Sequence, residues 1–332
     1  MHPIVVTSGV DSEYVLGGFA EHLRSKGYVV HEIDFGASNA DFRPLLESLS
    51  SSKVAFVTSS HANLTSRTAR MITPLFWEKY PNYLAPLEIL PILKPQVSVY
   101  VPHDLLSPFG DRNLDEYRFL DLFDHLLAPQ DFPELQTQVG QRTQVHSAGW
   151  IKYRAHPVDQ PLEAHLDALP YPRISFMISS IQFLTDKYGP AGLVQYYKSI
   201  LTKGVRVKLP VWSGVEQIEE AIRNHTEAEV IDSHYSSASL IAQSDLVVCN
   251  AASSILAESI LAGVPGICLL DDEAESAELK IEKLREYPQL VFHDYRSRAA
   301  IPTEVLDDVL SQKLAKRLKP IDYDFMESLI CV

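Results

Sequence analysis

The 332-residue sequence has few cysteines, and its three form no metal-binding or redox spacing. Cys249 and Cys268 lie inside apolar, strand-like runs, where a reduced and buried thiol is the ordinary expectation. This pattern suits a reducing compartment such as the cytoplasm.

Long apolar runs are also absent. No stretch approaches the roughly 18 apolar residues that a membrane-spanning helix needs. The first ten residues, MHPIVVTSGV, show no basic leader followed by an apolar segment. We therefore expect a soluble, unsecreted, cytoplasmic protein without a transmembrane segment.

Basic residues are scarce relative to acidic ones. The sequence has 29 Lys and Arg against 43 Asp and Glu, which gives a formal net charge of -14. Broad binding to nucleic acid or to an anionic membrane requires clustered positive charge, so neither is an expected partner. A local basic groove is still compatible with this balance.

The composition is otherwise that of a globular protein, with 46% hydrophobic and 22% charged residues. A single core seldom accommodates a chain of this length, so we expect two domains of about 150 residues with a cleft between them.

Short apolar runs alternate with amphipathic stretches along the first half. The alternation predicts a parallel sheet with helices on both faces, in other words a Rossmann-like α/β domain. The expected strands are 3–9, 28–35, 54–60, 97–102, 124–129 and 143–150, and the expected helices are 12–26, 41–52 and a longer stretch from about 66.

A proline-rich segment without periodicity, 154–172, is interpreted as a linker between a first domain, 1–153, and a second domain, 173–332. The alternation then restarts, which predicts a second Rossmann-like sheet facing the first across a cleft. Its expected strands are 173–180, 205–212, 228–232 and 245–249, with helices near 189–203, 215–224 and 236–243. The acidic run 271–286 is expected to be a solvated helix, and an amphipathic C-terminal helix could pack back on the first domain.

Residues 244–270, SDLVVCNAASSILAESILAGVPGICLL, indicate a strand, a turn of small residues, a helix, a Gly-Val-Pro stop and a second strand. In an open α/β sheet, a helix that begins beyond a strand end offers free N–H groups and a positive dipole end to a phosphate. Tight packing of strand against helix is the alternative explanation for the small residues. Glu258 follows one turn later in an apolar context, where the hydroxyls of a sugar would satisfy its carboxylate.

This stretch resembles the C-terminal-domain signature of GT-B fold glycosyltransferases and of the related non-hydrolysing sugar-nucleotide 2-epimerases. The resemblance implies that the turn meets the diphosphate of a nucleotide sugar, through Ala252, Ser253 and Ser254, and that Glu258 binds the ribose. Many members have Gly-Gly or Ser-Gly at this turn, where the present chain has Ala-Ala-Ser-Ser.

Polar or aromatic residues at the other strand ends of the second domain are further candidates for donor binding. In similar GT-B proteins the loop after the second strand frames the base, which implies that Trp212 or its neighbours form a stacking platform. Packing of Trp212 beneath the linker is the alternative, as is a role for His234 beside the helix start at Ser236. These candidates are Ser179, Ser180, Pro210, Val211, Trp212, His234, Tyr235 and Asn250.

The catalytic base and the acceptor site are expected in the first domain. An inverting transfer needs one base at the acceptor hydroxyl, and a histidine with a nearby carboxylate suits this task. His103 followed by Asp104 supplies such a pair, in a stretch loosely similar to the acceptor loop of GT-B polyol-phosphate transferases but without their following Gly. We rank His103 first, Asp11 second and His61 third. Gly9, Glu13, Asp104 and Arg67 are candidates for acceptor binding, although a solvated helix face also explains Arg67.

The sequence therefore favours an inverting glycosyltransferase that moves a sugar from a nucleotide-sugar donor to a hydroxyl acceptor. No Asp-x-Asp triplet stands at a strand end, so we expect neither a metal nor a cofactor beyond the nucleotide sugar. Alternatives are a sugar-nucleotide 2-epimerase or hydrolase, a GT-B-like polyol-phosphate transferase, and a non-catalytic sugar-nucleotide-binding protein.

Overall fold

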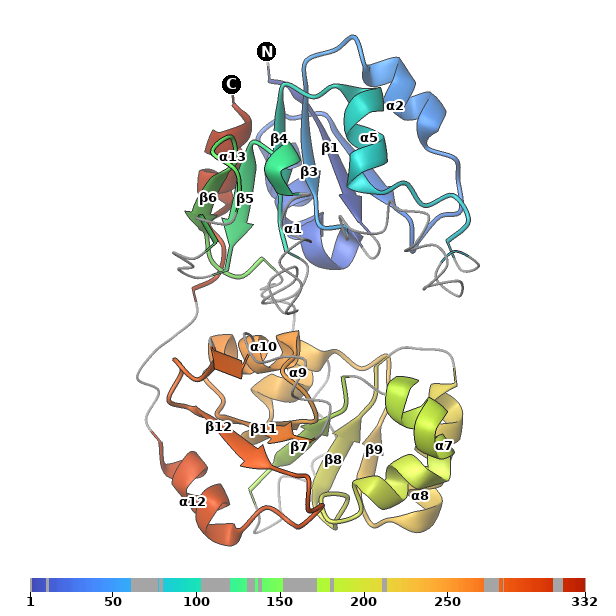
Figure 1. Cartoon of the computed structure of the whole chain (residues 1–332), viewed down its shortest axis with the longest axis vertical. Helices are drawn as coiled ribbons and strands as arrows, with labels where there is room; N and C mark the ends of the chain where they lie inside the picture. Colours follow the sequence, from blue (N-terminus) through green and yellow to red (C-terminus); the bar gives the residue numbers. More distant parts are fainter. Residues whose placement is uncertain are drawn as a thin grey trace. The chain divides into compact units, whose positions relative to one another are not determined.

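The chain forms two compact units, seen here in a computed structural model (Figure 1). Unit 1 comprises Met1–Arg154 with Lys319–Val332, and unit 2 comprises Ala155–Leu318. The structure describes residues 2–9, 12–60, 77, 80–102, 120–129, 135–136, 139–151, 172–179, 182–210, 214–271, 281–282, 284–312 and 319–331. For residues 12–14, 182 and 183 it describes the backbone only.

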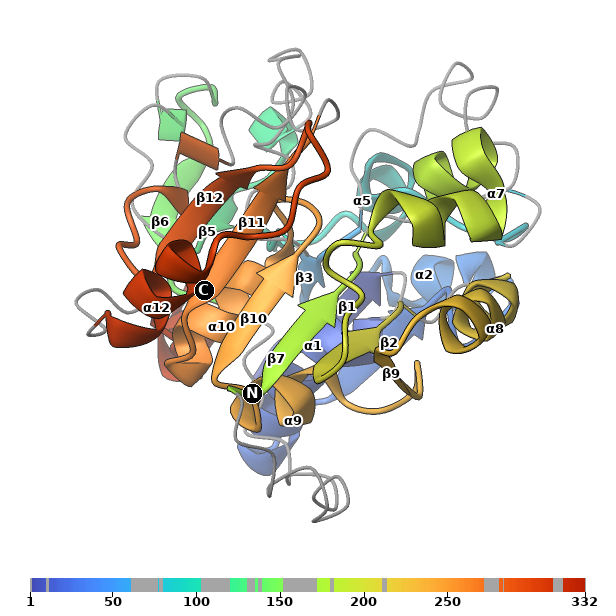
Figure 2. The same ribbon diagram turned by 90° about the horizontal axis from the view of Figure 1, so that it is seen from below.

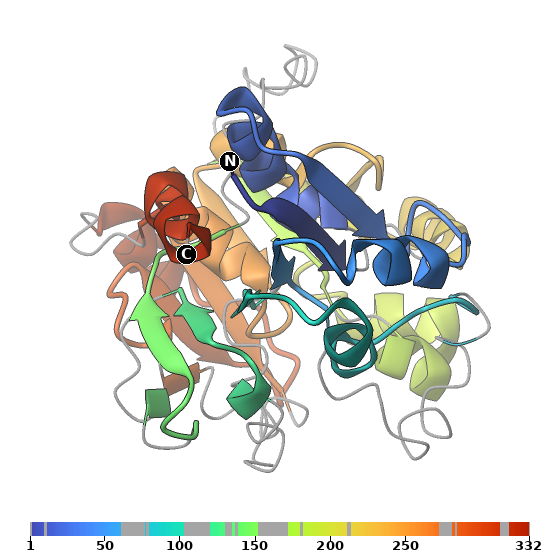
Figure 3. The same cartoon turned by 90° about the horizontal axis from the view of Figure 1, so that it is seen from above.

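Unit 1 contains a parallel sheet of six described strands in the order β2-β1-β3-β4-β5-β6 (Figure 3). The predicted alternation of strands and helices is confirmed. The strands are β1 (Ile4–Gly9), β2 (Val30–Asp34), β3 (Val54–Thr58), β4 (Val97–Tyr100), β5 (His125–Ala128) and β6 (Gln144–Ser147). The helices include α1 (Ser12–Ser25), α2 (Arg43–Leu49), α5 (Pro86–Leu93) and α13 (Tyr323–Ile330). Phe19 of α1, Val57 of β3 and Met326 of α13 belong to one buried cluster, so α1 and α13 share a face of the sheet.

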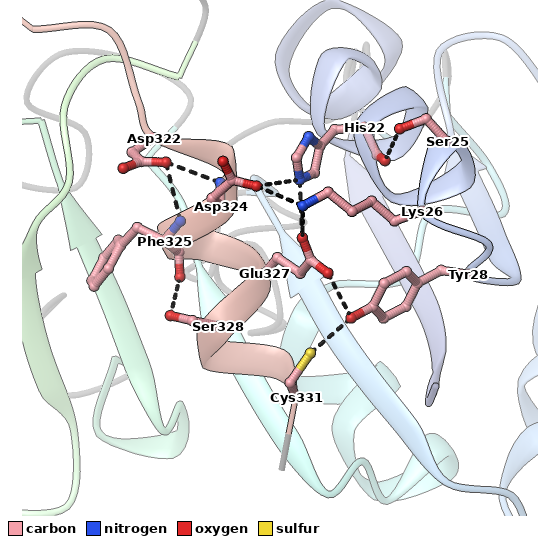
Figure 4. A network of polar contacts seen from close by, with 10 residues as sticks. All are labelled: His22, Ser25, Lys26, Tyr28, Asp322, Asp324, Phe325, Glu327, Ser328 and Cys331. Atoms are coloured by element: carbon pink, nitrogen blue, oxygen red, sulfur yellow. Dashed lines mark hydrogen bonds and ion pairs between the residues drawn. The ribbon is translucent and has the colours of Figure 1, made fainter. Parts of the chain in front are cut away.

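The C-terminal helix α13 belongs to unit 1, together with the extended segment 319–322 that leads into it. The backbone of Trp150 pairs with this segment, donating to Lys319 O (2.7 Å) and accepting from Ile321 N (3.1 Å). Polar contacts then fix the helix against α1 and the turn that follows α1, as Figure 4 shows. Lys26 Nζ lies 2.7 Å from Asp324 Oδ1 and 3.0 Å from Glu327 Oε2.

Two further side chains complete this C-terminal clasp, defined as the contacts of His22, Lys26 and Tyr28 with Asp324 and Glu327. His22 Nε2 lies 3.1 Å from Glu327 Oε2, and the Tyr28 hydroxyl donates to Glu327 Oε1 at 3.0 Å. The lysine ammonium thus sits among the acidic groups and neutralises part of their charge.

Unit 2 contains a second parallel sheet of six described strands, in the order β12-β11-β10-β7-β8-β9 (Figure 2). The strands are β7 (Ile174–Met177), β8 (Val205–Lys208), β9 (Glu229–Ile231), β10 (Leu246–Cys249), β11 (Gly266–Leu270) and β12 (Leu290–Asp294). The helices include α7 (Gln182–Tyr196), α8 (Val215–His225), α9 (Ser237–Ala242), α10 (Ser254–Ala262) and α12 (Thr303–Ser311). Counted from β7, this is the doubly wound order 6-5-4-1-2-3, in which the winding reverses between β7 and β10.

The two faces of this sheet carry different helices. Phe176, Val207 and Val248 belong to a buried cluster with residues of α7, α8 and α12. Met177 and Val247 belong instead to a cluster with residues of α9 and α10. Side chains alternate between faces along a strand, so the neighbours of Met177 in register, Lys208 and Cys249, face α9 and α10 as well.

Two elements differ from the sequence-based expectation. Helix α7 begins at Gln182 rather than near 189, because it consists of two helical pieces joined at Gly189, whose φ is +69°. The Gly-Pro pair resembles a helix start, so the sequence indicated only the second piece. The end of the chain holds two helices, α12 and α13, in place of the one expected. Within the described part of the chain, no helix has the length and apolar character that a bilayer crossing requires.

Candidate functional site

The reversal of winding in unit 2 brings the carboxyl ends of β7 and β10 together, and Asn250 joins them. This residue follows β10 and is 4% exposed. Its side-chain oxygen accepts hydrogen bonds from the backbone N–H of Ser179 (2.8 Å) and from the Ser179 hydroxyl (3.2 Å), beyond the end of β7. Its amide nitrogen donates to the Tyr197 hydroxyl at 3.3 Å. Asn250 therefore forms a floor of hydrogen bonds that joins β7 to β10 at the reversal point, the place where doubly wound sheets bind ligands.

Helix α10 begins directly above this floor without a side-chain cap. Ser253 is its N-cap residue, in an extended conformation (φ −124°, ψ 171°), yet its side chain accepts no hydrogen bond from the helix. The Ser253 hydroxyl instead lies 3.2 Å from Cys249 Sγ. Leu256 N donates to Ser253 O, but for the N–H groups of Ser254 and Ile255 no partner is found among the described residues. Two amides and the positive end of the helix dipole are therefore available to an anion.

The Cys249 thiol is buried beneath this turn and contacts the Ser253 hydroxyl. Burial raises the pKa of Cys249, and the hydrogen bonds from Ser253 and from the backbone N–H of Ala251 offset this effect only in part. The thiol therefore stays protonated at neutral pH. Burial likewise raises the pKa of Cys268, its neighbour on β11. Both cysteines are free and buried, which confirms the sequence-based expectation.

Glu258 is half-buried on α10, one turn beyond Ser254, and a buried cation lies within its electrostatic reach. Lys208, the last residue of β8, is 6% exposed. Burial lowers the pKa of Lys208, and the carboxylates of Glu258 and Asp232 act in the opposite direction. Sequence reasoning missed this residue, although a signal was present: in VRVK the two cations alternate with valines inside an apolar run, which places both on one face of the strand.

The turn between β9 and α9 lies beside Lys208, whose ammonium donates to Ser233 O at 2.8 Å. His234 is exposed, and its backbone N–H donates to Asp232 Oδ1 (2.8 Å). Tyr235 is half-buried, and its hydroxyl accepts from Gln243 Nε2 at 2.6 Å. Ser236 caps α9 by accepting from Ser239 N. The Tyr235 hydroxyl thus holds the C-terminal end of α9 through Gln243, while His234 is exposed to solvent.

Asp271 corrects one expectation about the acidic run 271–286. The run was expected to be a solvated helix, but Asp271 is buried just beyond β11 and accepts a hydrogen bond from the Tyr196 hydroxyl at 3.2 Å. Residues 272–280 and 283 of the run lie outside the described residues. The apolar strand β11 continues as far as Leu270, so Asp271, the next residue, is still close enough to the sheet to be buried. It adds a carboxylate to the same edge of the sheet as Asn250.

Further candidate residues comprise three that the structure describes, at least in part, and eight that lie outside the described residues. Pro210 is half-buried two residues after β8, and Gly9 is buried at the end of β1. Glu13 lies in the first turn of α1, where only the backbone is described. The candidates outside the described residues are Asp11, His61, Arg67, His103, Asp104, Ser180, Val211 and Trp212.

Unit 1 also reverses its winding, between β1 and β3, and hydroxyl groups line the strand ends there. Ser8 Oγ lies 2.8 Å from Thr58 Oγ1, and Ser60 N donates to Thr58 Oγ1 at 3.1 Å. The Ser59 hydroxyl is buried and has no hydrogen-bond partner among the described residues. This edge carries Gly9, so one candidate of the acceptor group lies at the reversal point.

In comparisons of sequence, no family model and no curated protein matches the chain. Solved structures do match its fold. MnaA from S. aureus, in a co-structure with UDP, gives a TM-score of 0.59 at 11% identity, over 98% of this chain and 95% of the other. The chain therefore shares the fold of this protein, with two Rossmann-like parallel sheets.

Two further structures agree. A Listeria monocytogenes protein assigned as a UDP-N-acetylglucosamine 2-epimerase gives a TM-score of 0.54 at 12% identity, over 99% of this chain and 94% of that one. Anabaena Alr3699/HepE in complex with UDP-glucose gives 0.51 at 13% identity, over 99% and 98%. At these identities the similarity supports the fold alone, and the GT-B resemblance expected from residues 244–270 is confirmed at that level.

Proposed function

We propose that the chain is a glycosyltransferase that moves a sugar from a nucleotide-sugar donor to a hydroxyl acceptor. The observation that carries this proposal is the uncapped start of α10 above the Asn250–Ser179 floor. A diphosphate would accept hydrogen bonds from the amides of Ser254 and Ile255 and would lie in the field of the helix dipole.

The remaining donor contacts follow from the same edge of the sheet. Glu258 would accept hydrogen bonds from the ribose hydroxyls, and the loop after β8, with Pro210, Val211 and Trp212, would frame the base. Two proteins of this fold are known with UDP or UDP-glucose, which makes uridine nucleotides the first donor class to examine.

We propose an inverting reaction without a metal. A base takes the proton of the acceptor hydroxyl as its oxygen attacks the anomeric carbon, and the bond from that carbon to the diphosphate oxygen breaks. The charge that develops on the leaving diphosphate is stabilised by the amides at the start of α10. Candidate bases are His103, then Asp11, then His61, with Gly9, Glu13, Arg67 and Asp104 on the acceptor side. The free buried thiols suit a cytoplasmic protein.

A donor panel tests this proposal. The full chain is heated with UDP-, GDP-, CMP- and dTDP-sugars, because a ligand at 100 times its dissociation constant adds about 2.7 kcal/mol to the free energy of unfolding. We expect one nucleotide class to raise the melting temperature, and the same sugar to be transferred to an acceptor in the presence of EDTA. If no nucleotide sugar stabilises the protein, the proposal fails.

A 2-epimerase is the second candidate, because the Listeria protein of the same fold is assigned that activity. Incubation with UDP-N-acetylglucosamine in the absence of any acceptor separates the two, since only an epimerase would produce the C2 epimer, which proton NMR detects. Binding without either reaction would instead indicate a non-catalytic sugar-nucleotide-binding protein.

A further inference from the structure

Lys208 presents a buried cation at the edge of the unit 2 sheet where the nucleotide is proposed to bind. Burying an ammonium is costly unless hydrogen bonds and opposite charges compensate for it. Two of its three N–H donors have partners in the described part of the chain, Ser233 O at 2.8 Å and Leu209 O at 3.3 Å. These carbonyls belong to the segments that follow β9 and β8, so the ammonium is anchored at the carboxyl edge.

The face on which Lys208 lies is the one covered by α10. Lys208 stands in register with Met177, and Met177 packs in the cluster with α9 and α10. Glu258 projects from α10, and its carboxylate comes first among the three acidic groups that favour the charged form of Lys208. Lys208 therefore lies on the side of the sheet that α10 covers, and its ammonium and the Glu258 carboxylate attract each other.

The other buried cation of this strand does not share that position. Arg206 lies on the same face, two residues before Lys208 and so farther from the carboxyl edge. Its guanidinium donates to Gln243 O, at the end of α9. It resembles Lys208 in burial and charge but not in location, and it provides a matched control.

We propose that Lys208 is a positioning residue, which balances the charge of Glu258 and orients its carboxylate to accept hydrogen bonds from the two ribose hydroxyls. This inference rests on the proposed function, because it takes Glu258 to face a nucleotide. It adds a determinant of specificity: the site discriminates a ribose from a sugar without the 2′ and 3′ hydroxyls through a lysine that need not contact the ligand.

The experiment combines protein variants with altered ligands. Full-length wild type, Lys208→Met and Arg206→Met are titrated calorimetrically with UDP and with 2′,3′-dideoxyuridine diphosphate. For Lys208→Met we expect the Kd for UDP to rise about tenfold, as for a pair of coupled groups, and the Kd for the dideoxy compound to stay unchanged. Arg206→Met should change neither. In a Glu258→Gln background, Lys208→Met should have no further effect.

Equal weakening of both ligands would overturn the inference, because it would indicate that Lys208 acts on the diphosphate or on the fold. An unchanged Kd for UDP would overturn it as well. If Lys208→Met does not fold, as judged by circular dichroism and thermal unfolding, Lys208→Gln replaces it, since an amide keeps a donor for Ser233 O without the charge. Failure of the proposed function is a separate result, in which wild type binds neither UDP nor its dideoxy analogue.

Discussion

At the scale of single residues, the most informative atom in unit 2 is a backbone nitrogen. Ser254 occupies the first position of α10, where proline is well tolerated, and the extended conformation of Ser253 is the one that a following proline requires. Its N–H has no partner among the described residues. A proline here would remove one amide of the proposed diphosphate site and leave the helix intact.

We predict that Ser254→Pro melts within a few degrees of wild type but binds UDP about tenfold more weakly, because a hydrogen bond to a charged group is lost. Ser254→Ala is the matched control, since it removes the hydroxyl and keeps the N–H. Calorimetric titration of both variants with UDP and with uridine supplies the comparison. Equal weakening for uridine, which has no diphosphate, would contradict the assignment of this amide.

The sequence predicted the position of a site residue where it follows a recognisable strand end. It did not predict the contacts or the burial of a side chain, because these depend on other segments that pack around it. The turn at Ser253 was recognisable because small residues follow an apolar run. That Asn250 would join two strands depends on Ser179, 71 positions earlier in the chain. That Ser253 would turn its hydroxyl to Cys249, four positions away, depends on the conformation of the turn between them. Lys208 was overlooked because a lysine at a strand end is ordinarily exposed, whereas here it faces the side of the sheet covered by α9 and α10 and is 6% exposed.

At the scale of elements, the C-terminal segment depends on a glycine. Gly149 has φ +92°, and a Cβ at this position would lie 2.6 Å from Pro320 O, in the backbone of the segment that leads into α13. Gly27 has a similar φ of +87°, but a Cβ there would meet no atom within 4 Å. The two glycines share the same backbone strain and differ only in the clash.

We predict that Gly149→Ala destabilises the protein more than Gly27→Ala does. The positive φ alone costs roughly 1 to 3 kcal/mol for a residue with a Cβ, and the clash with Pro320 adds to this in the first variant only. Urea unfolding of the two variants and wild type measures the difference. Equal losses would show that the segment around Pro320 moves aside without a cost in free energy.

The C-terminal clasp makes a second element-scale prediction, on pH. The hydrogen bond from Lys26 lowers the pKa of Asp324. Burial by itself would raise the pKa of Glu327, but the hydrogen bonds with Lys26, Tyr28 and His22 outweigh it, and this pKa is lowered too. A carboxylate with a lowered pKa stabilises the folded state above its ordinary pKa, here 4.5 for Glu327, and this stabilisation disappears as the pH falls through the lowered value.

Glu327→Gln should therefore reduce the free energy of unfolding at pH 7, and the gap from wild type should narrow as the pH falls below about 4.5. Lys26, whose pKa is raised by Asp324 and Glu327, loses its contribution only at high pH, above its ordinary value of 10.5. Glu47, exposed on α2, is the control position, because Glu47→Gln removes a carboxylate that takes no part in the clasp. A gap that stays constant between pH 7 and pH 4 would contradict the prediction.

At the scale of the whole molecule, the two parallel sheets could be predicted because each strand and each helix is recognisable from the apolar pattern of a short stretch of residues. The order of the strands could not, since the positions of β10 and β1 within their sheets depend on pairings between distant segments. The return of α13 to unit 1 was foreseen only as an option. Its amphipathic pattern indicates that one face is buried, but not which unit buries it.

The pairing of Trp150 with the segment after Lys319 has a consequence for synthesis on the ribosome. Domains at the start of a chain generally complete their folding first as the chain emerges. Here unit 1 cannot pack α13 until the whole of unit 2 has been translated, whereas unit 2 is one continuous stretch. The later unit is thus the first whose residues are all present, and the apolar surface of α1 that Met326 and Ile330 will cover stays open until the final residues are added.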